Sequence, residues 1–406
     1  MRYGVVLFDD EVRGLSSQKK KRSASGAFVS IDGGPARRIA SVTELESNVK
    51  WLTNFGFADF NENGLGRNPN FYFSGFLRTE LKAIAEEIGA GAEQMSTDKS
   101  AELLSALFGR VMHVATRTLR VELRTNSIST KGLADLIAAK TTNKNAIPDD
   151  INTALGHAYQ TYTTVLKKFP RDLKKVVLRK PRYTHALEIL TTPVPSEFQW
   201  VYVHGAKLPD SNSARIEWCL GSELPVLANV IVKPRRGEVG ALLSYNSGTS
   251  MERSWVCQPE LLMLSQFSDV EVIGAFVCEA GFEHQKELDE FPDYGDFSLS
   301  SYSLGLVAEN FWVAMASPRT SATNKKFFPP RAVWYRAMDR LAMFVEAVTL
   351  QRLGFDVFSY GFGCVTAYYP PGATQSMVEC ANERGLDVPA ATYAEIRTEV
   401  RLNADE

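Results

Sequence analysis

The stretch that decides the fold is a pair of apolar runs, VLANVIV at residues 226–232 and VEVIGAFVC at residues 270–278. Each is short and bounded by turn signals, which is typical of strands. Similar runs recur from about residue 183 onward, and their spacing favours a largely antiparallel sheet. The predicted strands cover residues 186–190, 198–203, 215–220, 226–232, 240–245, 270–278 and 304–316.

On both sides of this region the pattern becomes helical. Towards the C-terminus it predicts a helix at residues 332–353, a strand at 357–360, a turn at 361–363 and helices at 375–384 and 393–401. Towards the N-terminus, residues 77–168 have apolar residues at helical spacing. The last helix there opens at Pro148, Asp149 and Asp150 and closes at Lys167 and Lys168, so its end charges match the helix dipole.

The first 51 residues predict a strand, a hairpin and a helix. The strand covers residues 3–8, and the hairpin joins residues 27–31 to 36–42 through Asp32-Gly33-Gly34. This tripeptide supplies the positive φ angles that a tight hairpin turn needs. Thr43 and Glu46 have the spacing of a capping box for a helix through residue 51.

Strands and helices come in blocks rather than in regular alternation, which indicates an α+β protein. We expect a mixed α/β N-terminal region with a helical insertion, followed by a largely antiparallel β-rich region ending in helices. At 406 residues the chain exceeds the size of one core, about 250 residues. The expected domains are residues 1–76 (α/β), 77–180 (helical insertion or subdomain) and 181–406 (β-rich α+β).

The bulk composition predicts an ordinary soluble protein. The net charge is −2, and 45% of residues are hydrophobic. No apolar run approaches the roughly 20 residues that cross a bilayer, and the start lacks a signal-peptide pattern. The five cysteines are widely spaced without a zinc-ligand pattern. We therefore expect a reducing, cytoplasmic compartment and no membrane partner.

Against this neutral background, positive charge is concentrated between residues 167 and 182. The segment holds eight basic residues and one acid, Asp172. The basic residues are Lys167, Lys168, Arg171, Lys174, Lys175, Arg179, Lys180 and Arg182. Such segregation points to a polyanion partner.

Within this segment, Leu173, Val176 and Val177 make an apolar stripe, and basic residues repeat every four positions on another face. On a helix, like charges at that spacing repel by a few tenths of a kcal/mol per pair unless a polyanion offsets them. This favours phosphate binding. The alternative is a solvated surface face.

Three further basic stretches can extend such a surface. Arg110, His113, Arg117, Arg120 and Arg124 fall on one face if a helix runs that far, although residues 118–123 also fit a strand. Arg235 and Arg236 lie in a loop between two strands. Residues 319–331 carry Lys325 and Lys326 beside Phe327 and Phe328, whose rings either stack unpaired bases or anchor the loop.

An enzyme alternative rests on acidic residues near the N-terminus. Asp9 and Asp10 end the first predicted strand, and Glu46 lies in the predicted helix that follows the hairpin. Strand, hairpin and acid-bearing helix resemble the start of a ribonuclease H-like domain over about 50 residues. The resemblance implies a nuclease dependent on Mg²⁺ or Mn²⁺, with Asp9, Asp10 and Glu46 as catalytic ligands. The next strand departs from the pattern, because Ser74 stands where a carboxylate is expected.

These features lead to one hypothesis and two alternatives. The leading hypothesis is a non-enzymatic nucleic-acid-binding protein that grips the phosphate backbone of single-stranded RNA or DNA with little base specificity and needs no cofactor. The first alternative is the metal-dependent nuclease. The second is a self-assembling structural protein, a homo-oligomer or larger assembly, in which the acidic run at residues 279–296 docks on a neighbour's basic segment.

Overall fold

The computed structural model shows two compact units, each described here by itself. The N-terminal unit comprises Met1–Lys140 and Glu290–Phe311, and the C-terminal unit comprises Thr141–Asp289 and Trp312–Glu406. The structure describes residues 2–7, 27–40, 42–53, 71–73, 96–118, 147–165, 172–235, 237, 242–243, 255–284, 305, 308–309, 311–320, 326–389, 391–393 and 395–396. Helices and antiparallel-rich sheets occur in blocks, which confirms the predicted α+β class. The division into three sequence regions stays a prediction.

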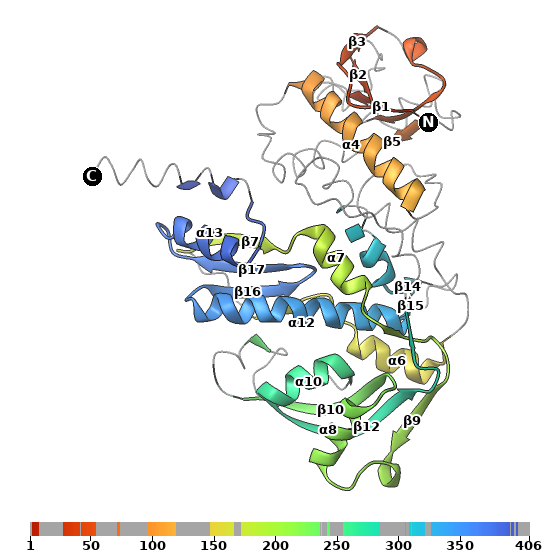
Figure 1. Cartoon of the computed structure of the whole chain (residues 1–406), viewed down its shortest axis with the longest axis vertical. Helices are drawn as coiled ribbons and strands as arrows, with labels where there is room; N and C mark the ends of the chain where they lie inside the picture. Colours follow the sequence, from red (N-terminus) through yellow and green to blue (C-terminus); the bar gives the residue numbers. More distant parts are fainter. Residues whose placement is uncertain are drawn as a thin grey trace, which may run out of the picture. The chain divides into compact units, whose positions relative to one another are not determined.

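The N-terminal unit is built on a five-stranded sheet in the order β3-β2-β1-β4-β5 (Figure 1). Its strands are β1 (Arg2–Leu7), β2 (Ala27–Ile31), β3 (Arg37–Ile39), β4 (Val49–Thr53) and β5 (Phe71–Phe73). The predicted hairpin is confirmed, with Asp32 and Gly33 at positive φ. Helix α4 (Thr97–Thr118) packs on the sheet, where the Tyr3 and Phe108 rings meet edge to face at 5.3 Å.

The helix predicted at residues 43–51 is wrong. The chain makes one short 3-10 helix, η2 (Val42–Glu44), and then strand β4, which lies parallel to β1. All five residues of β4 are buried, so the strand places Trp51 and Leu52 in the core. Glu46 does not cap a helix, because its carboxylate binds Arg2. The acid-bearing helix that the ribonuclease H-like resemblance implied is therefore absent at these residues.

The C-terminal unit contains two four-stranded antiparallel sheets, in the orders β6-β16-β17-β7 and β11-β10-β12-β9. The first consists of β6 (Thr163–Thr164), β16 (Asp356–Gly361), β17 (Cys364–Tyr369) and β7 (Lys174–Arg179). The second consists of β11 (Trp255–Cys257), β10 (Val226–Pro234), β12 (Ser268–Cys278) and β9 (Trp200–His204). Two small ribbons pair β8 (Val194–Pro195) with β13 (Phe282–Glu283) and β14 (Arg319–Thr320) with β15 (Lys326–Phe327).

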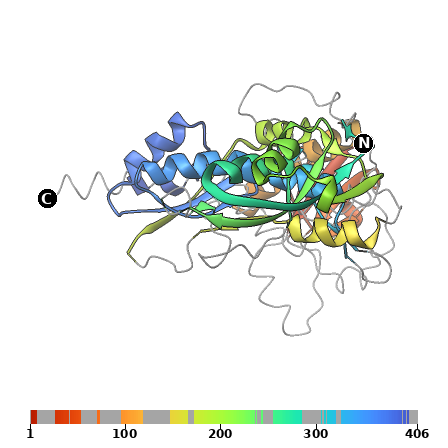
Figure 2. The same cartoon turned by 90° about the horizontal axis from the view of Figure 1, so that it is seen from below.

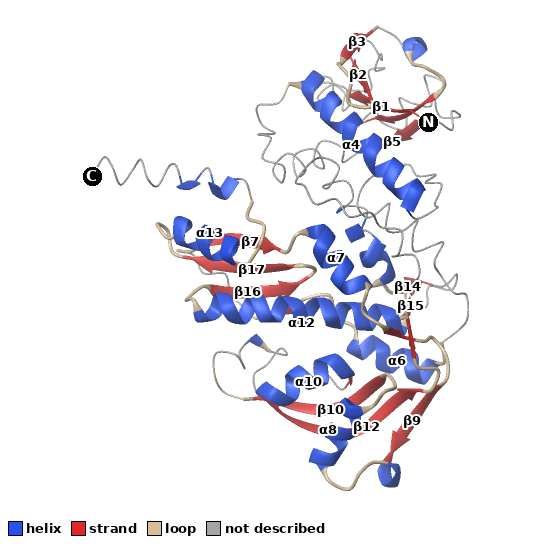
Figure 3. Ribbon diagram, viewed as in Figure 1, coloured by secondary structure: helices blue, strands red, loops and turns tan. Residues whose placement is uncertain are grey.

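One hydrophobic core joins both sheets of this unit through the long helix α12 (Pro330–Arg352). Figure 3 shows α12 running alongside β16 and β17, with α10 on its other side. The remaining helices are α6 (Asp149–Ala158), α7 (Arg182–Leu190), η5 (Gly205–Lys207), α8 (Asn212–Gly221), α10 (Gln258–Phe267) and α13 (Thr374–Glu383). In Figure 2, α6 lies across the second sheet from α8 and α10. Among the described helices, none combines the length and apolarity that a membrane span requires.

Three predicted strands are helices in the structure. Residues 186–190 belong to α7, residues 215–220 belong to α8, and residues 311–315 are helical. Helix α7 buries neighbouring residues one turn apart, namely His185, Ala186, Ile189 and Leu190. In a stretch this short, the sequence pattern of apolar residues in a buried helix is the same as that in a buried strand.

The ends of the predicted basic helices also differ. Helix α6 begins at Asp149 as predicted but ends at Ala158, and Thr163–Thr164 then pairs with β16 as strand β6. The predicted apolar stripe of Leu173, Val176 and Val177 does not form, because Leu173 precedes strand β7 and Val176 and Val177 lie on opposite faces of it. Pairing along β17 favours the strand, because alternate residues Val176 and Leu178 enter the core.

Candidate nucleic-acid interface

Part of the basic segment forms strand β7, which has one apolar face towards the core and one basic face. Its ladder partner is β17, from Lys174 opposite Tyr369 to Arg179 opposite Cys364, and on its other side Arg179 alone makes a β-bridge, to Asp387. Side chains alternate between the faces of a strand. Val176 and Leu178 are buried on the core face, so Lys175 and Arg179 share the opposite face. At about 3.3 Å per residue their Cα atoms are about 13 Å apart.

Two exposed acids form ion pairs with basic residues of this segment. Lys174 Nζ lies 2.8 Å from Glu395, and Lys180 Nζ lies 3.4 Å from Glu188. Both carboxylates are about half exposed, and surface pairs of this kind contribute about 0–1 kcal/mol. Lys175 is exposed and has no ion-pair partner among the described residues. The edge therefore keeps positive charge that a polyanion can neutralise.

Just beyond β7, the turn between β16 and β17 is held by a buried carboxylate. Asp339, in the middle of α12, is fully buried. It accepts hydrogen bonds from the backbone N–H groups of Phe362 and Gly363, the latter at 2.7 Å. Its Oδ1 also lies 2.8 Å from Nε2 of His185 on α7. In the same corner, Lys180 N donates to Gly363 O at 2.9 Å, so β7 ends against this turn.

Phe362, at the tip of the turn, is the centre of an aromatic stack. Its ring lies 6.0 Å from the Tyr162 ring at an interplanar angle of 25°. Trp312 packs against Phe362 with a centroid distance of 5.5 Å. The buried Arg336 guanidinium lies 4.9 Å from the centroids of both Phe362 and Trp312, as in a cation–π contact. Phe362 is thus covered by fixed neighbours, whereas Tyr162 is 46% exposed.

Burial and nearby charges shift the pKa of the Tyr162 hydroxyl in opposite directions. Partial burial raises the pKa of the Tyr162 hydroxyl above its usual range, and the neighbouring Cys364 adds to the increase. Arg336 and Arg179 act in the opposite direction. The phenol therefore stays neutral at physiological pH.

A buried ion pair fixes the chain segment that carries Tyr162. The Arg340 guanidinium binds Glu260 of α10 and also donates to the backbone carbonyl of Gln160. Both charged residues are almost fully buried. Breaking such a pair costs about 3–5 kcal/mol, since the remaining charge has no counter-charge. Gln160 is two residues from Tyr162, so the buried pair between α12 and α10 holds the chain segment that carries the exposed ring.

The hairpin at residues 319–331 is anchored by α6. Asn152 accepts from Phe328 N at 2.9 Å and donates to Lys326 O at 3.1 Å. The Phe328 ring packs against Tyr159 at 5.4 Å and against Gly156. Phe328 is therefore an anchor of the hairpin, whereas Phe327 is half-buried and Lys326 is exposed.

Two arginines at the base of this hairpin lie close together. Burial, together with the positive charge of Arg331, lowers the pKa of the Arg319 guanidinium to about 10, while Glu197 acts against both. Burial also raises the pKa of Glu197. The hairpin base thus carries a second group of positive charges, Arg319 and Arg331, whose field acts on the Glu197 carboxylate.

The structure brings together only part of the predicted site. Lys174, Lys175, Arg179, Lys180 and Arg182 lie along β7 and at the start of α7. Arg110, His113 and Arg117 belong to helix α4 of the N-terminal unit. Arg235 lies at the end of β10, where it binds Asp269 at 2.9 Å. Outside the described residues lie Asp9, Asp10, Arg120, Arg124, Lys167, Lys168, Arg171, Arg236 and Lys325.

The acids of the nuclease alternative can be placed only in part. Glu46 lies 2.8 Å from Arg2, and Asp32 lies 3.6 Å from the same guanidinium. Both carboxylates therefore share one half-exposed guanidinium. In the part of the chain that the structure describes, no group of three His, Cys, Asp or Glu side chains is arranged to hold a metal ion.

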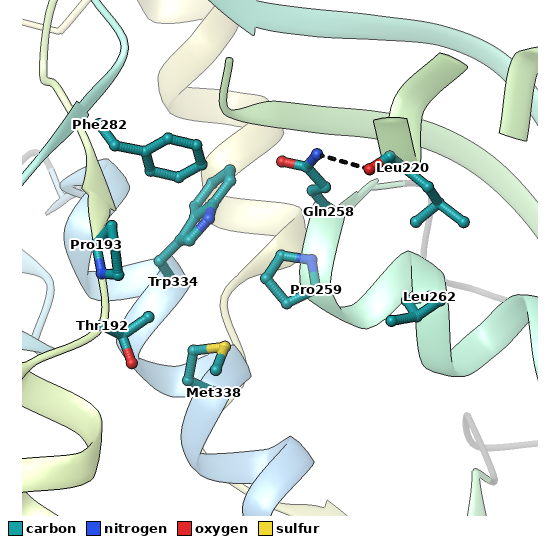
Figure 4. A pocket seen from close by; sticks show the side chains of 9 residues that line it. All are labelled: Thr192, Pro193, Leu220, Gln258, Pro259, Leu262, Phe282, Trp334 and Met338. Carbon is teal, nitrogen blue, oxygen red and sulfur yellow. Dashed lines mark hydrogen bonds between the residues drawn. The ribbon is translucent and has the colours of Figure 1, made fainter. Parts of the chain in front are cut away.

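A separate hollow of about 390 Å³ opens between α10, α12 and β13 (Figure 4). Its lining is almost entirely apolar, with Trp334 and Met338 on one wall and Leu262 on another. Gln258 turns its amide away, donating to backbone carbonyls that include Cys219 at 2.9 Å and Ser222 at 3.0 Å. Among the described residues, no charged side chain lines this hollow.

Comparisons with known proteins do not assign a family. No protein-family model matches the chain, and no curated protein matches it. Phi29 DNA polymerase with primer-template DNA and incoming nucleotides has a TM-score of 0.46 and 10% identity, covering 90% of this chain and 80% of its own. Its complex with single-stranded DNA has a TM-score of 0.46 and 11% identity, covering 84% and 76%.

A family B DNA polymerase from the archaeon Pyrobaculum calidifontis gives a TM-score of 0.39 at 11% identity, covering 96% of this chain and 56% of the polymerase. Below a TM-score of 0.5, these likenesses transfer no activity to this chain. The function is therefore inferred from the site alone.

Proposed function

We propose that this protein binds nucleic acid without catalysing a reaction on it, and that it grips the phosphate backbone of a single strand with little base specificity. The observation that carries the proposal is the basic edge of β7. Lys175 and Arg179 leave one face of this strand, and Lys180 and Arg182 follow where the strand meets α7.

The charge balance along this edge favours a polyanion. Residues 172–182 hold five basic residues and one acid in a chain of net charge −2. Arginine binds phosphate through two parallel hydrogen bonds and lysine acts as a point charge, so a mixed row suits a repeating backbone. The exposed pairs with Glu188 and Glu395 are weak enough for phosphates to replace the carboxylates. Phosphate contacts position a strand but carry no sequence information directly, which is why little base specificity is expected.

Binding of labelled oligonucleotides followed by fluorescence anisotropy tests this proposal. We expect the full-length protein to bind single-stranded RNA or DNA, with the logarithm of the affinity falling linearly with the logarithm of salt concentration. Freshly purified protein should carry nucleic acid, seen as a high ratio of absorbance at 260 nm to that at 280 nm. Absence of binding at low salt, together with a ratio typical of pure protein, would contradict the proposal.

A further inference from the structure

The exposed Tyr162 ring precedes β6, at the other end of the sheet from β7, and stacks on Phe362, which is two residues before the β17 partner of Arg179, Cys364. It is 46% exposed, and its inner side faces Phe362 in a stacked arrangement. Trp312 and the Arg336 guanidinium cover Phe362 in turn. Among the described residues the Tyr162 hydroxyl has no hydrogen-bond partner, so no polar contact accounts for its place at the surface.

The support is fixed in several independent ways. Phe362 has a positive φ of 59°, a conformation uncommon for a side chain of this size, and Asp339 holds its backbone N–H. Gly361, at φ 125°, lies against the Thr161 carbonyl so closely that a Cβ there would be 2.7 Å from the oxygen. The tip of the turn and the segment before β6 are therefore packed backbone to backbone. Little ordering entropy remains to be lost when a ligand stacks on the ring.

We infer that Tyr162 is a base-stacking residue: an unpaired nucleobase stacks on its exposed face while the side chains of β7 hold the adjoining phosphates. This inference rests on the proposed function and adds the unpaired nucleobase as the second part of the ligand that the site contacts. Aromatic side chains stack with any base, so the contact tolerates all sequences. In a duplex the base faces are already stacked on one another, so Tyr162 favours single strands over duplexes.

Substitutions at Tyr162 in the full-length protein separate stacking from charge. Tyr162→Ala should weaken single-strand binding about tenfold, equal to about 1.4 kcal/mol, with duplex affinity and the salt slope unchanged. Tyr162→Leu, which keeps apolar contact with Phe362 but offers no aromatic face, should give the same loss. Tyr162→Phe should bind as the wild type does. Phe198→Ala removes another exposed ring, 44% exposed, and should leave binding unchanged.

An oligonucleotide containing 2-aminopurine gives a direct readout, since stacking of this base on an aromatic ring quenches its fluorescence. Quenching should occur with wild type and Tyr162→Phe and disappear with Tyr162→Ala and Tyr162→Leu. Equal single-strand affinity and quenching for wild type and Tyr162→Ala would overturn this inference while leaving phosphate binding intact. A wild-type protein that binds neither single strands nor duplexes would instead overturn the proposed function itself.

Discussion

Asp339 on α12 and His185 on α7 are joined by a 2.8 Å contact between Oδ1 and Nε2, although 154 residues separate them in the sequence. The same carboxylate accepts from the turn between β16 and β17. One buried side chain thus ties three elements together at the end of the basic edge. The exposed groups of the proposed site owe their positions to this interior network.

Asp339→Ala should therefore destabilise the protein strongly. The change leaves two backbone N–H groups and the His185 ring without their acceptor, and each unsatisfied buried group costs about 1–3 kcal/mol. We expect the free energy of unfolding in urea to fall by about 3 kcal/mol or more. Asp356→Ala, at an exposed position of β16, is the matched control and should change it by less than about 0.5 kcal/mol. Similar values for the two variants would contradict the assigned role of Asp339.

Gly361→Ala tests the close packing beneath Tyr162. The new methyl group would meet the Thr161 carbonyl at 2.7 Å and would require a backbone conformation that side chains rarely adopt. We expect a loss of about 1–3 kcal/mol of stability and a displaced Tyr162, measured as weaker single-strand binding by the protein that remains folded. Gly354→Ala is a control at another positive-φ glycine, where the new methyl group would meet no described atom within 4 Å, and it should cost stability without affecting binding.

Phe327 and Phe328 should respond differently to truncation. Phe328→Ala removes a ring packed on Tyr159 and Gly156, so it should lower the free energy of unfolding by about 2–3 kcal/mol, somewhat less than for a fully buried Phe. For Phe327→Ala we expect single-strand binding about tenfold weaker, near 1.4 kcal/mol, with the melting temperature almost unchanged. A large fall in melting temperature with normal binding by the folded Phe327→Ala protein would make both rings structural anchors.

The absence of catalysis is tested with metal and a variant at the candidate acid. Wild-type protein should not cleave RNA, DNA or hybrid substrates in the presence of Mg²⁺ or Mn²⁺. Asp10→Asn should bind single strands as the wild type does. Metal-dependent cleavage that is lost in Asp10→Asn would establish the nuclease instead.

Some elements of the fold could be predicted because their signals are local. Asp32-Gly33 specifies a hairpin turn by its backbone conformation, and the long apolar pattern of α12 exceeds the length of any strand. A short apolar run such as the one in α7 fits a helix and a strand equally well, so packing decides which of the two it forms. The capping-box spacing of Thr43 and Glu46 was misleading for a similar reason, since burial of Trp51 in the sheet outweighs a local cap.

The candidate site, too, could be predicted from the sequence only in part. The density of positive charge around β7 is visible in the sequence, but its presentation on a strand edge depends on pairing with β17. The stack of Tyr162 on Phe362 joins residues from distant segments, which no local pattern reveals. One signal was available: α12 carries Arg336, Asp339 and Arg340 within an apolar helix, and charged residues in a buried helix are usually paired. Those three residues build the support beneath the site.

The salt dependence of single-strand affinity in two charge-matched variants tests the central claim most directly. Lys175→Gln combined with Arg179→Gln removes two positive charges from the face of β7. Lys207→Gln combined with Arg352→Gln removes two exposed charges elsewhere and leaves the same net charge. Each phosphate contact on a single strand contributes about 0.7 to the slope of log affinity against log salt. We predict that the β7 variant loses about 1.4 from this slope and that the control keeps the wild-type slope. Equal slopes in the two variants would contradict binding of a phosphate backbone at this edge.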